Sequence, residues 1–294
     1  DPEVTPEATE QPIEFPGPGS YTVRHRINGV ERSYRVTIPA SYSDDGDPLP
    51  LVIALHGAGG TGAGIESYSG FNALAEREGF IVAYPNGVNN AWNDGRPGST
   101  IDDVDFIARM ITFIEASLNI DPSRIYATGH SMGGMFSFRL GCELPERIAA
   151  VASVASTFPE YLGLACVDAP PVPVMIVQGT DDLIVPWVGI RDAYLSAGAS
   201  LAYWAQRNGC TVYSGIEVLE DSDPDDGTRV MRERQSECDE DADVQLYGIY
   251  FGGHTWPGHV IGISFELGLT SMDIDATEVI WSFFQEHNIE AETG

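Results

Sequence analysis

The sequence predicts an α/β protein with a mostly parallel central sheet, helices on both faces, and an antiparallel hairpin at its N-terminal end. Three observations support this fold class. Uninterrupted apolar runs such as residues 51–55 are typical of strands buried on both faces. These runs alternate with helical patterns such as residues 101–118, where apolar residues recur every three or four positions. Near the start, β-branched and aromatic segments flank Asn28-Gly29, a pair typical of tight hairpin turns.

The remaining elements follow from the same patterns. Apolar or β-branched runs predict strands at 21–27, 30–38, 51–55, 80–84, 125–128, 148–154, 172–178, 213–219, 229–234 and 244–250. Helical periodicity predicts helices at 65–78, 101–118, 132–144, 201–208 and 275–287. Asp121-Pro122 is expected to form a turn before the strand 125–128. With no internal repeat and no second linker, we expect one domain at 18–294, after an acidic, proline-rich disordered linker at 1–17.

The composition excludes several classes of partner. The chain of 294 residues is 43% hydrophobic, which is enough for a sizeable core. Its 15 basic residues, all Arg, stand against 44 acidic ones, for a formal net charge of −29. Such a surface repels nucleic acid and anionic membranes. No apolar run approaches the roughly 18 residues that a membrane span needs, so no membrane span is expected.

The four cysteines are Cys142, Cys166, Cys210 and Cys238, and they contain no C-x-x-C pair. A zinc ribbon or a thioredoxin-type motif is therefore disfavoured, and two disulfides are the alternative. The sequence allows three pairings; we expect neighbours to pair, Cys142 with Cys166 and Cys210 with Cys238. Each bridge would then stabilise the fold by about 3 kcal/mol. Disulfides favour an oxidising compartment, so we expect an extracellular protein, with a cytosolic one as the alternative.

Residues 129–134 read Gly-His-Ser-Met-Gly-Gly and lie between a predicted strand and a predicted helix. In that context G-x-S-x-G is typical of a nucleophile elbow, a turn so sharp that neighbouring side chains would collide. Ser131 would project its hydroxyl above the sheet. The alternative is a glycine-rich turn with no chemical role.

A serine nucleophile needs a base and an acid, and both are expected later in the chain on loops that follow strands. The strand 172–178 is followed by Asp181 and Asp182, and the strand 244–250 is followed by His254. The order Ser, Asp, His is the one expected for this architecture. His56 and His130 lie within motifs of their own and are expected to brace the loop after residue 55 and the elbow.

Four motifs together resemble the polyhydroxybutyrate depolymerase and feruloyl esterase group of α/β-hydrolases. They are H-G-x-G at 56–59, G-x-S-x-G-G at 129–134, G-T-x-D-x-x-V-P at 179–186 and G-G-H-x-W-P-G at 252–258. The resemblance spans about residues 20–290 and implies the α/β-hydrolase fold. It also implies the nucleophile at Ser131, the base at His254 and the acid at Asp182, because the family's acid is the fourth residue of G-T-x-D. The cysteines also lie where similar secreted esterases have theirs.

The tetrahedral intermediate of ester hydrolysis needs hydrogen-bond donors already in place. We expect these donors to be the backbone N–H groups of Ala58 and Met132. Trp92, Trp187 and Trp256 fall on loops at the predicted active-site end, so we expect their rings to contact substrate, with ordinary packing as the alternative.

The acidic run at 221–227 is the one segment that suggests a cation. It does not fit an EF-hand, because its glycine comes one place late and Arg232 occupies the position of the bidentate glutamate. A solvated loop between two strands is the better interpretation. No residues suggest catalytic zinc or a phosphate-binding loop, so no metal and no cofactor are expected.

These observations predict a secreted, monomeric serine carboxylic-ester hydrolase that works through an acyl-enzyme on Ser131. Feruloyl, aryl or short-chain esters of plant polysaccharide are the favoured substrates. The alternative is a polyester depolymerase acting on polyhydroxybutyrate or poly(ethylene terephthalate). A peptidase or acyltransferase with the same triad, and a binding module without catalysis, are less favoured.

Overall fold

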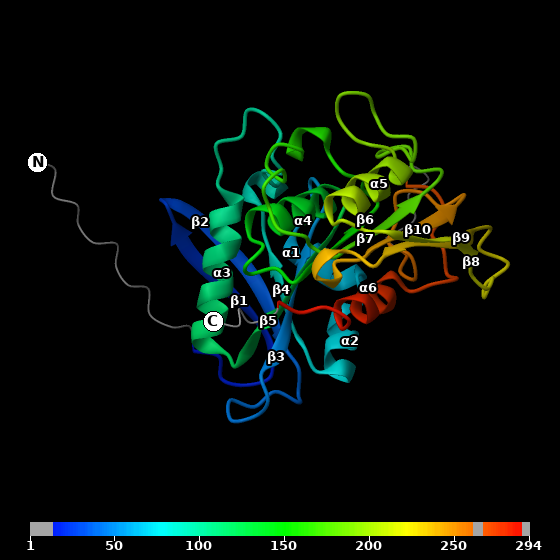
Figure 1. Ribbon diagram of the computed structural model, residues 1–294. Helices are drawn as coiled ribbons and strands as arrows, with labels where there is room; N and C mark the ends of the chain where they lie inside the picture. Colours follow the sequence, from blue (N-terminus) through cyan, green and yellow to red (C-terminus); the bar gives the residue numbers. More distant parts are fainter. Residues whose placement is uncertain (1–13, 261–266, 290–294) are drawn as a thin grey trace, which may run out of the picture.

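The computed structural model describes residues 14–260 and 267–289, so most of the predicted linker at 1–17 lies outside it. Within these residues the core is a ten-stranded sheet in the order β1-β2-β4-β3-β5-β6-β7-β10-β9-β8 (Figure 1). Its strands are β1 (Gly19–Ile27), β2 (Val30–Ile38), β3 (Leu49–Leu55), β4 (Ile81–Pro85), β5 (Ile120–His130), β6 (Ala150–Val154), β7 (Val174–Gly179), β8 (Val212–Val218), β9 (Arg229–Ser236) and β10 (Val244–Tyr250). The helices are α1 (Gly62–Tyr68), α2 (Phe71–Glu78), α3 (Asp103–Ser117), α4 (Met132–Glu143), α5 (Ala197–Arg207) and α6 (Ala276–Phe284).

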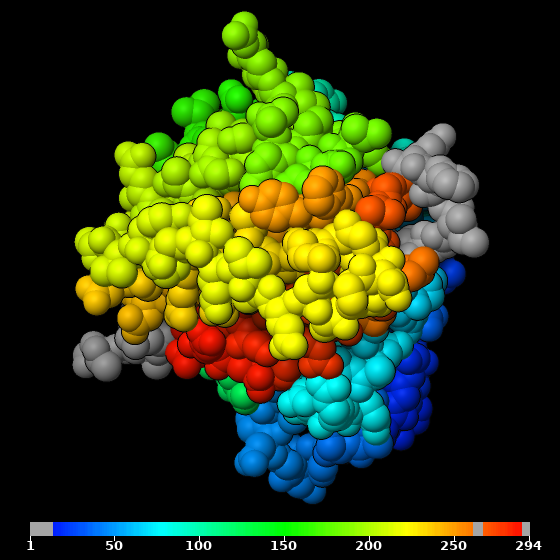
Figure 2. All heavy atoms as spheres, turned by 90° about the vertical axis from the view of Figure 1, so that its right-hand side faces the viewer, coloured from blue at the N-terminus to red at the C-terminus, as the bar shows by residue number. Residues whose placement is uncertain are grey.

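The middle of the sheet is parallel and both edges are antiparallel. Strands β4, β3, β5, β6, β7 and β10 pair in parallel, whereas β1 and β2 form the predicted N-terminal hairpin. At the other edge β9 and β8 add a second antiparallel pair, which was not predicted. Short connections produce this edge, because they can join only antiparallel neighbours. In Figure 2 the β8–β9 hairpin (yellow) lies at the surface above helix α6 (red).

Helices cover both faces of the sheet, as predicted. One apolar cluster includes Ile107 of α3, Phe136 of α4 and Trp204 of α5. A second cluster, on the other face, includes Phe71 of α2 and Trp281 of α6. The central strands β3, β4, β6 and β7 are buried along almost their whole length, and ligands in such sheets bind beyond the carboxyl ends of the strands.

Two elements differ from the predictions in more than the position of a helix or strand end. The expected helix at 65–78 is two helices, because Gly70 adopts φ +76° and starts α2 in a new direction. The strand expected at 125–128 begins at Ile120, since Asp121-Pro122 forms an irregularity within the pairing of β5 with β3 rather than a turn before it.

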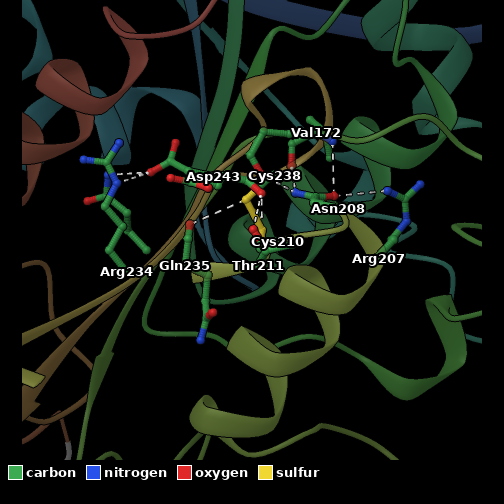
Figure 3. The surroundings of a disulfide bond; sticks show 12 residues. Val172, Arg207, Asn208, Cys210, Thr211, Arg234, Gln235, Cys238 and Asp243 are labelled. Atoms are coloured by element: carbon green, nitrogen blue, oxygen red, sulfur yellow. Dashed lines mark hydrogen bonds and ion pairs between the residues drawn. A yellow bond between two sulfur atoms is a disulfide. The ribbon is translucent and has the colours of Figure 1, made fainter. Parts of the chain in front are cut away.

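The disulfides join Cys142 to Cys166 and Cys210 to Cys238, which confirms the predicted pairing. The second bridge follows α5 and lies near the start of β10 (Figure 3). Beside it, the Asn208 amide donates to the carbonyls of Val172 and Ala242, at 2.7 and 2.8 Å. This bridge therefore connects the segment that follows β9 to the segment that follows α5, near the amino end of β10.

Candidate active site

Ser131 lies at the sharp turn between β5 and α4. Its backbone has φ +56° and ψ −121°, a strained conformation for a residue with a side chain. The Ser131 N–H donates to the carbonyl of Val154 at 2.8 Å, which attaches the turn to the neighbouring strand β6. This geometry is that of the predicted elbow, with the serine beyond the carboxyl end of β5 and at the start of a helix.

The glycines of the motif allow the elbow to approach its neighbours. A Cβ atom at Gly129 would lie 2.5 Å from the carbonyl carbon of Gly133. One at Gly133 would lie 2.7 Å from the carbonyl carbon of Leu55, and one at Gly134 would lie 2.5 Å from the Ser153 hydroxyl. Each position excludes any side chain, so the sequence pattern follows from contact between β5, α4 and the end of β3.

Asp182 and His254 meet directly although 72 positions separate them. The Nδ1 atom of His254 lies 2.8 Å from Oδ2 of Asp182, and both side chains are buried. The Asp182 carboxylate also accepts hydrogen bonds from the backbone N–H groups of Ile184 and Val185, each at 2.8 Å. The Asp182 carboxylate is therefore held rigidly, and its contact with Nδ1 leaves Nε2 of His254 for another partner.

Gln178 is a residue of this site that sequence reasoning missed. Its amide nitrogen donates to Oδ2 of Asp182 at 3.1 Å and to the Val185 carbonyl at 2.8 Å. The available signal was its place near the end of a buried strand, where a polar side chain needs partners. Asp181, the alternative acid, points away: its side chain is exposed and accepts from the Thr180 hydroxyl.

His130, which precedes Ser131 in the chain, packs against the ring of His254. Its ring centroid is 4.8 Å from that of His254. Burial, together with the nearby His254, lowers the pKa of His130 to about 3, so the ring is neutral across the physiological range. Because the His130 ring is neutral, it does not repel the positive charge that His254 would carry as an imidazolium.

The residues expected to bind the oxyanion lie on two sides of Ser131. Met132 is the first residue of α4, so its N–H has no acceptor within the helix. Ala58 is exposed in the loop after β3, and Gly57 next to it is so close that a Cβ atom there would lie 3.3 Å from Cβ of Ser131.

His56 sets the orientation of this loop. The N–H of Gly87 donates to Nε2 of His56 at 3.0 Å, so the hydrogen of the neutral ring is on Nδ1, which donates to the Gly57 carbonyl at 2.8 Å. Burial lowers the pKa of His56 and favours this neutral form. Because the C=O and N–H of a trans peptide point in opposite directions, a fixed Gly57 carbonyl fixes the direction of the Ala58 N–H.

Two of the three predicted substrate-binding tryptophans are in the core, so the prediction is wrong for Trp92 and Trp256. Trp256 is 0% exposed, and its indole donates to the Thr277 hydroxyl. Trp92 is 3% exposed and stacks on Phe136. The position of a tryptophan on a loop does not show which way its ring points. Burial of a large aromatic surface is favourable, and both rings lie in the core.

Trp187 is half-buried and is the member of the three that keeps part of its ring at the surface. Its ring packs over Gly248, where a Cβ atom would lie 2.9 Å from the indole.

The acidic run at 221–227 is a loop held by hydrogen bonds. The Asp226 carboxylate accepts from the N–H groups of Thr228 and Met272, each at 2.6 Å. In the described ranges no group of three acidic, histidine or cysteine side chains is arranged to hold a metal ion. Likewise, none of the described helices is long and apolar enough to cross a membrane.

A serine elbow after a parallel strand, followed in chain order by an acid and a histidine, defines a class of enzymes, the α/β-hydrolases. Comparisons with known proteins agree. A model of the alpha/beta hydrolase fold matches residues 50–166. A putative esterase, NocK, of Nocardia uniformis subsp. tsuyamanensis is 30% identical over 252 residues, which cover 79% of this chain and 72% of that protein.

Two further relatives extend the comparison. Feruloyl esterase B of Piromyces equi is 34% identical over 61% of this chain, and the match covers 36% of that longer protein. The structure of an acetyl xylan esterase from Aspergillus awamori superposes with a TM-score of 0.62 at 18% identity, covering 90% of this chain and 99% of that one, a likeness of fold. The chain belongs to the α/β-hydrolase family, and it is similar in sequence to esterases of that family.

Proposed function

We propose that Ser131, His254 and Asp182 form the catalytic triad of this carboxylic-ester hydrolase. The observation that carries the proposal is the contact between His254 Nδ1 and the buried Asp182 carboxylate, next to a strained serine elbow. Asp182 holds the imidazole in the tautomer whose Nε2 accepts a proton and stabilises the imidazolium that results.

The reaction has two halves. Ser131 Oγ attacks the ester carbonyl carbon while Nε2 of His254 takes its proton, and the N–H groups of Ala58 and Met132 bind the oxyanion. The tetrahedral intermediate then expels the alcohol, which receives that proton and leaves an acyl-enzyme. Water, deprotonated by His254, attacks the acyl group; the acid is released and the serine regains its hydrogen.

For substrate, we favour feruloyl, other aryl, or short-chain esters carried on plant polysaccharide. Support comes from the names of the relatives, which include a feruloyl esterase and a bifunctional acetylxylan esterase/xylanase. Trp187, half-buried on the loop that follows Asp182, is one aromatic side chain available to contact an aryl group.

A polyester is the second candidate, and the surface beside Asp182 favours it. Leu183 and Val188 are 85% and 79% exposed on the loop after β7, and residues 244–260 contain no acidic side chain. Exposed apolar side chains beside Asp182, on a chain with net charge −29, suit a neutral polymer better than an acidic polysaccharide.

We also propose that the enzyme acts outside the cytoplasm, as a monomer. The two disulfides support an oxidising compartment. Light scattering on the purified protein checks the oligomeric state: a mass near twice that of the chain would contradict the monomer.

A hydrolysis panel tests the reaction and separates the substrates. Wild type and Ser131→Ala are assayed on p-nitrophenyl acetate, butyrate and octanoate, on methyl ferulate, and on films of polyhydroxybutyrate and poly(ethylene terephthalate). We expect the substitution to reduce kcat by about 10⁵-fold or more, as for other triad nucleophiles. Ser67→Ala, an exposed hydroxyl on α1, is the matched control and should retain wild-type rates.

Each outcome of the panel decides one question. Serine-dependent turnover of methyl ferulate without film erosion supports a cell-wall esterase. Film erosion supports a polyester hydrolase. Equal activity of Ser131→Ala and wild type would overturn the triad, and no turnover of any ester would overturn the proposed function.

A further inference from the structure

A buried ion pair lies outside the proposed triad. Arg32 of β2 and Asp103, the first residue of α3, are 2.5 Å apart, and their side chains are 3% and 1% exposed. The Arg32 guanidinium also lies 3.8 Å above the ring of Phe106. Burying two charges costs about as much free energy as their attraction returns. Stability by itself is therefore a weak explanation for this buried pair.

The second carboxylate oxygen of Asp103 reaches toward the active site. Oδ2 accepts the backbone N–H of Asn93 at 2.6 Å. The Asn93 side chain donates to the Ile101 carbonyl at 2.6 Å, and Arg139 donates to the Asn93 carbonyl at 2.7 Å. The backbone immediately after Trp92 is therefore fixed by groups from α3 and α4, and Arg32 of β2 holds the Asp103 carboxylate.

Trp92 in turn touches both sides of the predicted oxyanion hole. Its indole N–H donates to the His56 carbonyl at 2.9 Å, at the start of the loop that carries Ala58. Its backbone N–H lies 3.3 Å from the sulfur of Met132, and its ring stacks on Phe136 of α4 with centroids 5.1 Å apart. A movement of Trp92 would change the separation between the two sides.

We propose that Asp103, held by Arg32, is a positioning residue that fixes Trp92 and thereby the spacing of the Ala58 and Met132 N–H groups. The inference rests on the proposed function of those groups. Donors to an oxyanion must lie about 2.7–3.1 Å from its final position. A small displacement of a donor therefore reduces the stabilisation of the transition state more than it reduces the affinity for the substrate.

Two variants test this. Arg32→Met combined with Asp103→Leu removes both charges and leaves no unpaired ion in the core. Trp92→Phe removes the indole N–H and keeps an aromatic ring over Phe136. For each we expect kcat on p-nitrophenyl butyrate to fall about tenfold or more with KM within about twofold, since the loss is confined to the transition state. Affinity for a boronic acid, which becomes tetrahedral on the serine, should fall by a similar factor.

Combining the variants shows whether the ion pair acts through Trp92. If it does, the kcat of the triple variant should be close to the lower kcat of the ion-pair variant and Trp92→Phe, because both changes disrupt the same interaction. Fold losses that multiply would overturn the inference, and so would an ion-pair variant with wild-type kcat and boronate affinity. If the ion-pair variant does not fold, Arg32→Met with Asp103→Asn replaces it in the same cycle, because this pair leaves no unpaired ion and exchanges the charged acceptor of the Asn93 N–H for a weaker, neutral one.

A second buried carboxylate provides the control. Asp243 pairs with Arg234 at 2.8 Å next to the Cys210–Cys238 disulfide, at the amino end of β10 (Figure 3). Arg234→Met with Asp243→Leu should alter the melting temperature and leave kcat unchanged; an equal loss of kcat would mean that removing any ion pair with a buried carboxylate has this effect. If the wild type is active and the variants are unaffected, this inference alone is overturned. If the wild type is inactive, the proposed function is overturned as well.

Discussion

The two ends of the parallel strands differ in backbone strain. At the carboxyl ends of β5, β6 and β10, the next residues are Ser131, Ala155 and Phe251, with φ of +56°, +52° and +61°. None of the described residues immediately before β3, β5, β6, β7 or β10 has a positive φ. Strained backbone conformations cost about 1–3 kcal/mol each and persist where surrounding structure enforces them. Strained residues thus stand directly beyond the carboxyl ends of these three strands, next to the proposed chemistry, while at the amino end of β10 the positive φ values of Glu240 and Asp241 lie farther from the strand.

The amino end of β10 instead holds a cluster of paired charged and polar groups. Asp243, directly before β10, contacts Arg234, Gln245 and His287, at 2.8, 3.1 and 2.9 Å. The comparison teaches that one end of the same strands sets geometry and the other contributes stability. Substitutions at the two ends should therefore separate rate from stability.

The largest expected effect is at the carboxyl end. Asp182→Asn keeps the shape of the side chain but favours the wrong His254 tautomer, so kcat should fall about 10⁴-fold. Steady-state kinetics and thermal melting are measured together. A loss of kcat below about tenfold would break the assignment of Asp182 as the acid.

The next effect is at the amino end. Replacing Cys210 and Cys238 by Ala opens a loop spanning 28 positions, and unfolding in denaturant should show a loss of about 3 kcal/mol. The kcat of the folded variant should stay within about twofold of wild type, because the bridge lies away from the elbow. A tenfold slower enzyme with normal folding would contradict the division between the two ends.

The smallest effect concerns the pH dependence of stability. Burial alone would raise the pKa of Asp243, but hydrogen bonds from His287 and Gln245 and the charge of Arg234 outweigh it, so the pKa is lowered. A carboxyl with a lowered pKa stabilises the fold above the unfolded pKa of about 3.9, and that stability is lost as the pH falls through the folded pKa.

Asp243→Asn should accordingly be less stable than wild type at pH 7, by about 1–2 kcal/mol, with the gap closing below pH 4 or so. Urea unfolding at several pH values measures it. A gap that is constant with pH would show that the Asp243 charge contributes nothing.

Local patterns predicted most of the fold and part of the site. The elbow could be predicted because its glycines and its serine are adjacent in the chain, and their steric requirement is local. The strand and loop order predicted which residues follow the carboxyl ends. Contacts across the fold were not accessible in this way: Arg32 and Asp103 are 71 positions apart, and nothing in either segment identifies the other. The direction of the Trp92 and Trp256 rings also depends on neighbours from other elements.

The order of the strands has a consequence for biosynthesis. The elbow at Ser131 is made well before His254, which follows β10, and β10 lies between β7 and β9 in the sheet. A nascent or truncated chain that ends before β10 has the proposed serine and the proposed acid but not the proposed base, so it should show no esterase activity. Recovery of esterase activity during refolding would likewise report the insertion of this one interior strand.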